Sequence, residues 1–146
     1  MNVRVAMAIM ALLLASAVRA APSSDAAAVV DAFHSALARG DANATSALLA
    51  DDALIFEEGG AERTKAEYVA KHLPTDIEFS KSVGSTMTWR SGGSGGDVAW
   101  VASEGRLTGS YHGKAVNRVT TETVILHRTD GSWKIVHIHW SSAPRH

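Results

Sequence analysis

The second half of the chain constrains the fold most, because its hydrophobic period changes after Asp76 from helical to strand-like spacing. Three turn sequences divide this half into long alternating segments: SGGSGG, His112-Gly113 and Asp130-Gly131. Short turns of this chemistry join neighbouring antiparallel strands. The sequence therefore predicts a meander of strands at Ile77 to Arg90, Asp97 to Ser110, Ala115 to Arg128 and Ser132 to Ser142.

The residues before the meander have helical spacing. Val30, Phe33 and Leu37 recur every three or four positions, which predicts a helix from near Asp25 to Gly40. A shorter helix in ANATSALLA and a third in KAEYVAKHL lie on either side of a short strand, ALIFE. Helices that precede an antiparallel meander indicate an α+β fold, with the helices packed on one face of a curved sheet.

Local signals set the bounds of the shorter elements. Thr64 is expected to cap the third helix, and Pro74 is expected to end it. The strand covers Ala53 to Glu57, and Gly59-Gly60 is expected to form the turn that follows.

Residues 1–20 are a predicted secretory signal peptide. Arg4 precedes an apolar stretch from Val5 to Ala15, and Val18-Arg19-Ala20 has the small-residue pattern of a cleavage site. The mature chain, residues 21–146, is expected to form a single exported domain in a bacterial periplasm, with no membrane contact after cleavage. It contains no cysteine, so it must be stable without disulfides.

The charge balance and the missing motifs exclude several functions. A formal net charge of −1 gives no electrostatic reason to expect a nucleic acid as partner. The chain has no P-loop, no G-x-S-x-G elbow and no cysteine nucleophile. We therefore expect no cofactor.

Two strings of residues resemble members of one superfamily. VVDAFHSALARGD together with ALLADDALIFEE resembles the N-terminal half of a ketosteroid isomerase and of exported SnoaL-like proteins. ETVILHRTDGSWKIVHIHWSSAP resembles the association domain of calcium/calmodulin-dependent kinase II. The chain is thus similar to the nuclear transport factor 2-like superfamily, whose cone-shaped roll of helices and bent sheet encloses a pocket. That fold hosts enzymes, carriers and assembly modules, so it does not by itself imply an activity.

The resemblance to ketosteroid isomerase implies three catalytic positions. This chain keeps a suitable residue at one of them and lacks it at the other two. The base position falls on Glu57, a carboxylate at a strand end and a candidate general base. The two oxyanion donors fall on Phe33 and on Val124 or Ile125, whose side chains have no hydrogen-bond donor. Losing one such donor typically raises a barrier by ~3–4 kcal/mol, so steroid isomerase activity is not expected. Glu57 as a solvated carboxylate without a role is the alternative.

The turn at Asp130-Gly131 decides which face of the sheet His137 and His139 occupy. In a two-residue turn, Glu122 faces His139 across the hairpin, as an acid–base pair would. In a three-residue loop, Glu122 faces Ile138 instead. A shift of one residue moves every side chain to the other face.

The kinase association domain favours the three-residue loop. Its pocket is lined by arginines, and their positions match Ala102, Val124 and Trp140 here. Val124 and Trp140 share a face only in the three-residue register. The resemblance therefore implies that His137 and His139 lie on the opposite face, where a second subunit often packs in this superfamily. We interpret both histidines as interface residues rather than catalytic ones.

All three pocket arginines are absent from this chain. An apolar, aromatic pocket with a few carboxylates suits an uncharged or cationic small organic molecule. Trp100, Ala102 and Glu104 are expected to share the pocket face with Glu122 and Val124. The predicted ligand-binding residues are Phe33, Tyr68, His72, Trp100, Glu104, Glu122, Val124, Ile138 and Trp140.

No metal site is predicted. His127, His137 and His139 share a face in the three-residue register, but the chain has no cysteine and its histidines lack ligand spacing. Nearby carboxylates are expected on the other face of the sheet.

Three functions are consistent with these residues. The leading hypothesis is an exported small-molecule-binding protein that forms a homodimer or a larger oligomer. The second is a SnoaL-like isomerase, cyclase or lyase with Glu57 as general base. The third is an oligomeric assembly module like the kinase association domain.

Overall fold

The computed structural model describes residues 24–145, so the predicted signal peptide at residues 1–20 lies outside the described residues. Helices and strands follow one another along this range in two groups. The first half holds α1 (Ser24–Arg39), α2 (Ala42–Ala47), β1 (Leu49–Glu57), β2 (Gly60–Glu62), α3 (Lys65–Lys71) and α4 (Leu73–Ser82). The second half holds β3 (Val83–Gly95), β4 (Val98–Tyr111), β5 (Lys114–Thr129) and β6 (Ser132–Pro144).

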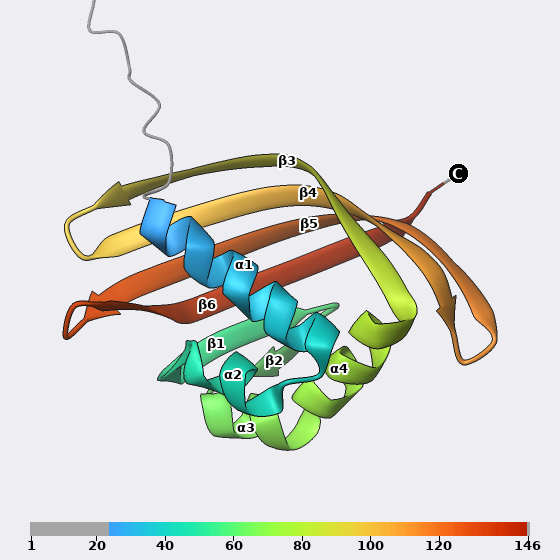
Figure 1. Cartoon of the computed structure of the whole chain (residues 1–146), viewed down its shortest axis with the longest axis horizontal. Helices are drawn as coiled ribbons and strands as arrows, with labels where there is room; N and C mark the ends of the chain where they lie inside the picture. The colour runs from blue at the N-terminus through green and yellow to red at the C-terminus, as the bar shows by residue number, and fades with distance from the viewer. Residues whose placement is uncertain (1–23, 146) are drawn as a thin grey trace, which may run out of the picture.

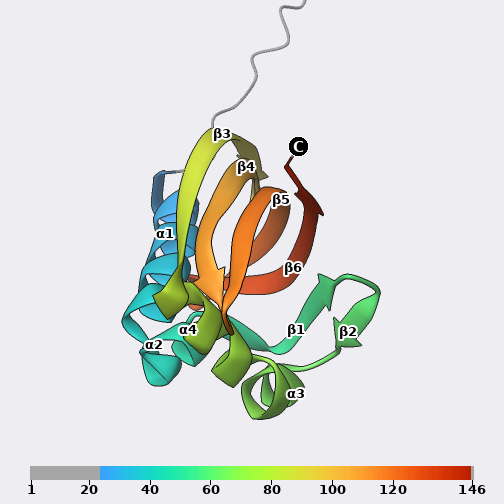
Figure 2. The ribbon, with the colours of Figure 1, turned by 90° about the vertical axis from the view of Figure 1, so that its right-hand side faces the viewer.

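These strands form one curved, open sheet in the order β2-β1-β6-β5-β4-β3. β1 runs parallel to β6, and all other neighbours are antiparallel. α1 lies across one face of the sheet, and α2, α3 and α4 gather beneath β1 (Figure 1). Figure 2 shows how strongly β3 to β6 curve, with α1 along one side. The predicted α+β fold, with helices on one face of a curved sheet, is confirmed.

The core lies between α1 and one face of the sheet, which we call the helix-facing face. Val30, Phe33 and Leu37 of α1 are at most 4% exposed, as their helical spacing predicts. They pack against buried side chains of four strands, which removes a continuous apolar surface from water. The strand residues of this cluster are Leu49, Ala53, Ile55, Ala99, Val101, Val124, Leu126, Ile135 and Ile138. Within the described residues, none of the helices has the length and apolar character needed to span a bilayer.

The prediction that Pro74 ends a helix and that a strand begins at Ile77 is wrong. α4 runs from Leu73 to Ser82 and carries Pro74 in its first turn. Proline is tolerated there, because the N–H groups of a first turn have no partner within the helix. Ile77, read from the sequence as the start of a strand, packs from α4 against the core.

The glycine-rich segment SGGSGG is strand rather than loop, since β3 continues to Gly95. The indole of Trp100 lies across Gly93 on the neighbouring strand, and a Cβ at Gly93 would come within 2.9 Å of its Nε1. Glycine is therefore required there by close approach rather than by a turn. The segment stays within one sheet.

The hairpin between β5 and β6 has a two-residue turn, so the predicted three-residue loop is wrong. Asp130 and Gly131 both have positive φ, 51° and 77°, and Thr129 pairs with Ser132. Positive φ at both central residues is the geometry of a type I′ turn, which suits an aspartate–glycine pair.

A β-bulge in β6 then shifts the register by one residue. Leu126 pairs with Ile135, but Ile125 pairs with His137, so Val136 is an extra residue. Beyond the bulge, Glu122 faces Trp140. The side chains therefore return to the faces that the three-residue loop had predicted, by a different route.

The face opposite the helices, which we call the outer face, carries both histidines of the hairpin. His137 pairs with Ile125, and His139 pairs with Thr123. The prediction that His137 and His139 lie on this face is confirmed. Residues of the outer face used below are Leu54, Phe56, Trp100, Glu104, Ile125, His137 and His139.

Trp100 and Glu104 were predicted to share a face with Glu122, and this is wrong. Ser103 lies opposite Glu122, whereas Trp100 lies opposite Ile125 and Glu104 opposite Thr121. Directly opposite residues of an antiparallel pair share a face. Trp100 and Glu104, together with Ala102, therefore belong to the outer face, where Trp100 is 44% exposed.

Candidate functional site

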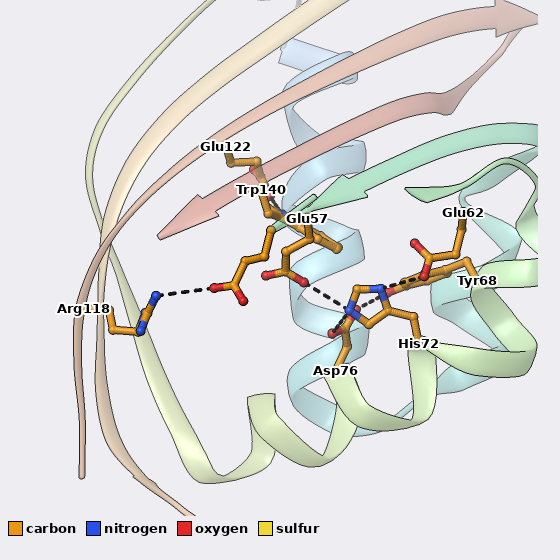
Figure 3. Close-up of polar contacts among 9 residues, drawn as sticks. Glu57, Glu62, Tyr68, His72, Asp76, Arg118, Glu122 and Trp140 are labelled. Atoms are coloured by element: carbon orange, nitrogen blue, oxygen red, sulfur yellow. Dashed lines mark hydrogen bonds and ion pairs between the residues drawn. The ribbon is translucent and has the colours of Figure 1, made fainter. Parts of the chain in front are cut away.

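A cluster of titratable side chains surrounds His72, at the junction between α3 and α4. Glu57 ends β1, Glu62 ends β2, and Asp76 lies in the first turn of α4. Figure 3 shows these three carboxylates on different sides of the imidazole, with dashed contacts that converge on it. We call His72, Glu57, Glu62, Asp76 and Tyr68 the His72 cluster.

Local structure brings the members of the cluster together. Glu58 and Gly59 turn the chain with φ of 47° and 85°, so that β2 folds back on β1 and Glu62 pairs with Ile55. As predicted, Thr64 caps α3, because its Oγ1 accepts a hydrogen bond of 3.1 Å from the N–H of Glu67. α3 then places Tyr68 and His72 on the side that faces β1.

His72 contacts all three carboxylates of the cluster. Its Nε2 lies 3.1 Å from Oε2 of Glu57 and 3.2 Å from Oδ1 of Asp76, and its Nδ1 lies 3.3 Å from Oε1 of Glu62. The side chain of His72 is 21% exposed, so water reaches the cluster. Hydrogen bonds to Asp76 and then to Glu57 raise the pKa of His72 to about 11, although partial burial opposes this.

Tyr68 supports the cluster from within the core. Its hydroxyl donates a hydrogen bond of 2.7 Å to Oδ2 of Asp76, and the residue is fully buried. Burial and the neighbouring charge of Asp76 raise the pKa of Tyr68, so the phenol stays protonated and acts as a donor.

A second network centres on Glu122. Its Oε2 accepts a hydrogen bond of 2.6 Å from Nε1 of Trp140 and lies 2.8 Å from Nε2 of His34 on α1. Burial raises the pKa of Glu122, but the contacts with His34 and Trp140 outweigh it and hold the pKa below its usual value. Burial likewise lowers the pKa of His34, and the carboxylate of Glu122 more than reverses this.

Trp140 joins the two networks. Its indole lies edge-on to the ring of His72 at a centroid distance of 6.3 Å and tilted to Phe33 at 6.3 Å. Figure 3 shows Trp140 and Glu122 on the sheet side of the His72 cluster. The site therefore has an acidic end at His72 and an aromatic side at Trp140.

Most of the predicted ligand-binding residues thus lie on the helix-facing side, and two do not. Glu57, Tyr68, His72, Glu122 and Trp140 form the two networks. Trp100 and Glu104 are separated from them by the sheet, and Glu104 lines a shallow, open depression of about 360 Å³ on the outer face. The remaining predicted residues, Phe33, Val124 and Ile138, are at most 1% exposed and belong to the core.

The comparison with protein families decides the classification of the chain. The family model of the SnoaL-like domain matches residues 26–145. This protein belongs to the SnoaL-like family. A search of curated proteins found no match.

Solved structures similar to this SnoaL-like chain agree with its fold. A candidate ketosteroid isomerase from Shewanella frigidimarina is 36% identical, with a TM-score of 0.79 over 82% of this chain and 96% of that one. A candidate calcium/calmodulin-dependent protein kinase II association domain from Xanthomonas campestris is 20% identical, with a TM-score of 0.69 over 82% and 86%. A nuclear transport factor 2-like protein of unknown function from Pseudomonas putida is 20% identical, with a TM-score of 0.69 over 81% and 84%.

Sequence reasoning missed two members of the SnoaL-like chain's His72 cluster, Glu62 and Asp76. Asp76 follows His72 by four positions, which is the spacing of neighbours on one helix face. That signal was available, but Pro74 between them was read as the end of the helix. Glu62 gives no comparable signal, because its position depends on the short β1–β2 hairpin.

Proposed function

We propose that this SnoaL-like protein binds a small organic molecule, uncharged or preferably cationic, at the His72 cluster. The observation that carries the proposal is the ratio of charges: one imidazolium faces three carboxylates. Among the described residues, no ion pair joins a lysine or arginine to Glu57, Glu62 or Asp76, and Arg118 pairs with Glu58 instead. The excess negative charge favours a positively charged group in a half-buried site.

The aromatic side of the site supports the same proposal. The indole of Trp140 and the ring of His72 offer apolar surface beside the carboxylates. Ligand sites usually combine an apolar lining with a few oriented polar groups, and indole rings attract cations through their π faces. An amine with an apolar body therefore fits this site better than a carboxylic acid does.

A matched series of ligands separates charge from shape. Mature protein, residues 21–146, is titrated in EDTA with 2-phenylethylamine, 2-phenylethanol and phenylacetate, and the heat of binding is measured. The amine is expected to bind about tenfold more tightly than the alcohol, as one charge contact implies, and phenylacetate is expected not to bind. Equal affinities for the three compounds would refute a charge-selective site.

Isosteric variants then locate the binding site. Glu62→Gln removes a charge from the cluster and is expected to weaken the binding of 2-phenylethylamine. Glu58→Gln is the matched control, because Glu58 lies in the β1–β2 turn but contacts Arg118 outside the cluster. Equal weakening by both variants would place the amine elsewhere.

One observation favours a second function, acid–base catalysis with Glu57 as general base. Its carboxylate ends β1 at the position implied by ketosteroid isomerase, and its Oε2 lies within hydrogen-bond distance of His72. The oxyanion donors remain absent, because Phe33 and Val124 are buried apolar residues. Once a bound compound is known, Glu57→Gln tests this function: retained binding with lost turnover supports it, and unchanged turnover refutes it.

We further propose that the protein forms homodimers through the outer face. Leu54, Phe56 and Trp100 each expose at least 38% of their surface there, beside His137 and His139. One similar structure is named as an association domain, which supports assembly through this fold. Light scattering after size exclusion is expected to give a dimer, and Phe56→Glu a monomer. Val69→Glu, at an exposed position on α3, is the control and is expected to stay dimeric.

Export is also proposed, from the signal peptide predicted at residues 1–20. Intact-mass measurement of protein isolated from the periplasm is expected to show a chain that begins at Ala21. Full-length protein in the cytoplasmic fraction would refute it.

A further inference from the structure

The Nε2 atom of His72 faces more acceptors than it can satisfy. Oε2 of Glu57 lies 3.1 Å away and Oδ1 of Asp76 lies 3.2 Å away, so two carboxylates compete for one nitrogen. A ring nitrogen carries at most one proton, and a hydrogen bond weakens steeply when it is bent towards a second acceptor. A single proton on Nε2 therefore forms a full hydrogen bond with at most one of the two carboxylates.

The same three atoms are grouped as metal ligands would be. One ligand atom each from Glu57, His72 and Asp76 lies within 4.8 Å of the others. Metal–ligand bonds of roughly 2.1 Å place neighbouring ligand atoms about 3.0 Å apart in octahedral and about 3.4 Å apart in tetrahedral geometry. The two contacts of Nε2 lie within that range.

The outer contacts of His72 and Asp76 have the pattern found around metal sites. Nδ1 of His72 lies 3.3 Å from a carboxylate oxygen of Glu62, which can accept its N–H. A histidine that binds a metal usually donates its other N–H to a carboxylate or carbonyl, which orients the ring. Asp76 is held in the same way, since its Oδ2 accepts the hydroxyl proton of Tyr68 and its Oδ1 points to the centre.

We propose that Glu57, His72 and Asp76 bind a divalent transition-metal ion through Oε2, Nε2 and Oδ1. One imidazole with two carboxylates suits Zn²⁺ or Mn²⁺, whereas Mg²⁺ and Ca²⁺ prefer oxygen ligands alone. Three protein ligands leave positions for water or a ligand. The ion adds two positive charges to three carboxylates and a neutral imidazole, so the site keeps a negative charge that tolerates an organic cation. The metal site goes beyond the function proposed above and does not depend on it.

Calorimetry with the metal alone tests the proposal. Untagged mature protein, stripped with EDTA and dialysed, is titrated separately with ZnCl₂, MnCl₂ and MgCl₂. Zn²⁺ or Mn²⁺ is expected to bind once per chain, and at least tenfold more tightly than Mg²⁺. Absence of a one-to-one site for both transition metals would overturn the proposal. Because no organic probe is present, this result is independent of the amine titration, which is done in EDTA.

Isosteric variants assign the ligands. Glu57→Gln and Asp76→Asn are each expected to lower the affinity for the metal ion by at least tenfold, because an amide is a poorer ligand than a carboxylate. His137→Gln is the matched control, since His137 is a half-buried histidine of the outer face, outside the His72 cluster. Thermal melts identify variants that fail to fold. The proposal would be overturned if both cluster variants kept the metal affinity of the unchanged protein, or if only His137→Gln lost it.

Paramagnetic broadening by Mn²⁺ gives a second measurement that needs no variant. The indole N–H of Trp140 is expected to broaden at substoichiometric Mn²⁺, because its ring is 6.3 Å from that of His72. The indole N–H of Trp100, across the sheet on the outer face, serves as the reference and is expected to broaden much less, because the broadening falls steeply with distance. Broadening of Trp100 alone would refute the site at His72.

Discussion

The molecule contains two groups in which histidine meets carboxylate, and they differ in how their charges balance. At Glu122, one carboxylate meets one imidazole and one indole N–H, and its Oε2 atom contacts both. At His72, one imidazole meets three carboxylates. The first network joins α1 to the sheet through the contact between His34 and Glu122. The second gathers more like charge than its own residues neutralise.

Under the proposed function, this difference would separate a structural role at Glu122 from a binding role at His72. A satisfied polar network stabilises a single packing arrangement, and removing a partner leaves a buried group unpaired. A site with excess charge is held in place by the surrounding fold and becomes balanced only when a positive group arrives. The Glu122 network should therefore matter for stability, and the His72 cluster for binding.

Removing the carboxylate of the balanced network is expected to have the largest effect. Glu122→Ala leaves the indole N–H of Trp140 and the imidazole of His34 without their acceptor, at a cost of about 3 kcal/mol in the free energy of unfolding. Urea denaturation measures this change. Glu104→Ala, on the outer face, is the control and is expected to change stability by less than ~0.5 kcal/mol. Equal losses in the two variants would contradict the comparison.

The next largest effect concerns the charge of His72. Its pKa rises from 6.5 to about 11 on folding, so its contribution to stability is fully present below pH 6.5. That contribution is lost as the pH rises towards 11, by on the order of 2 kcal/mol after allowing for solvent screening. Urea denaturation from pH 6.5 to 10.5 measures the loss. His72→Gln is expected to flatten the profile, and a profile equally steep in the variant would assign it to other groups.

Changing the residue that joins the two groups is expected to have a smaller effect. Trp140→Phe keeps a ring beside Phe33 and His72 but removes the N–H that binds Glu122. A loss of about 1 kcal/mol is expected, as for a typical hydrogen bond. Thermal denaturation detects it, and an unchanged midpoint would show that the 2.6 Å contact contributes nothing.

The smallest effect on stability is expected in the unbalanced cluster, and its sign is reversed. In EDTA, Glu57→Gln removes one of three like charges and should leave stability unchanged or raise it by up to ~1 kcal/mol. Urea denaturation beside Glu122→Ala gives the direct comparison. A loss as large as that of Glu122→Ala would mean that both groups are structural.

Sequence patterns predicted most of the fold, because its elements follow from local periodicity and turn chemistry. The apolar stripe of α1, the cap at Thr64 and three of the four long strands lie where their patterns place them. The start of β3 was misplaced, because Pro74 is compatible with both the end and the first turn of a helix. Only the packing of Ile77 against the core distinguishes the two.

Some residues of the His72 cluster were named from the sequence, and others were not. Glu57, Tyr68 and His72 carry residue types that suggest chemistry. Asp76 lies at the start of a helix that was not predicted, and Glu62 lies in a short strand, β2, that was not predicted after the expected turn. Trp100 and Glu104 were placed on the wrong face by analogy with the arginines of the association domain. The turn at His112-Gly113 contradicts that analogy, because counting back from it sets Trp100 opposite Ile125 and Glu104 opposite Thr121.

The β-bulge at Val136 has a consequence for comparing relatives of this chain. One added residue in β6 reverses which side chains beyond it face the helices and which face outwards, and it leaves both ends of the strand in place. A relative that lacks the extra residue would therefore show a one-position gap within β6. An alignment that places this gap after His139 instead of at Val136 would match interior residues of one protein to surface residues of the other, along the very strand that supplies Trp140.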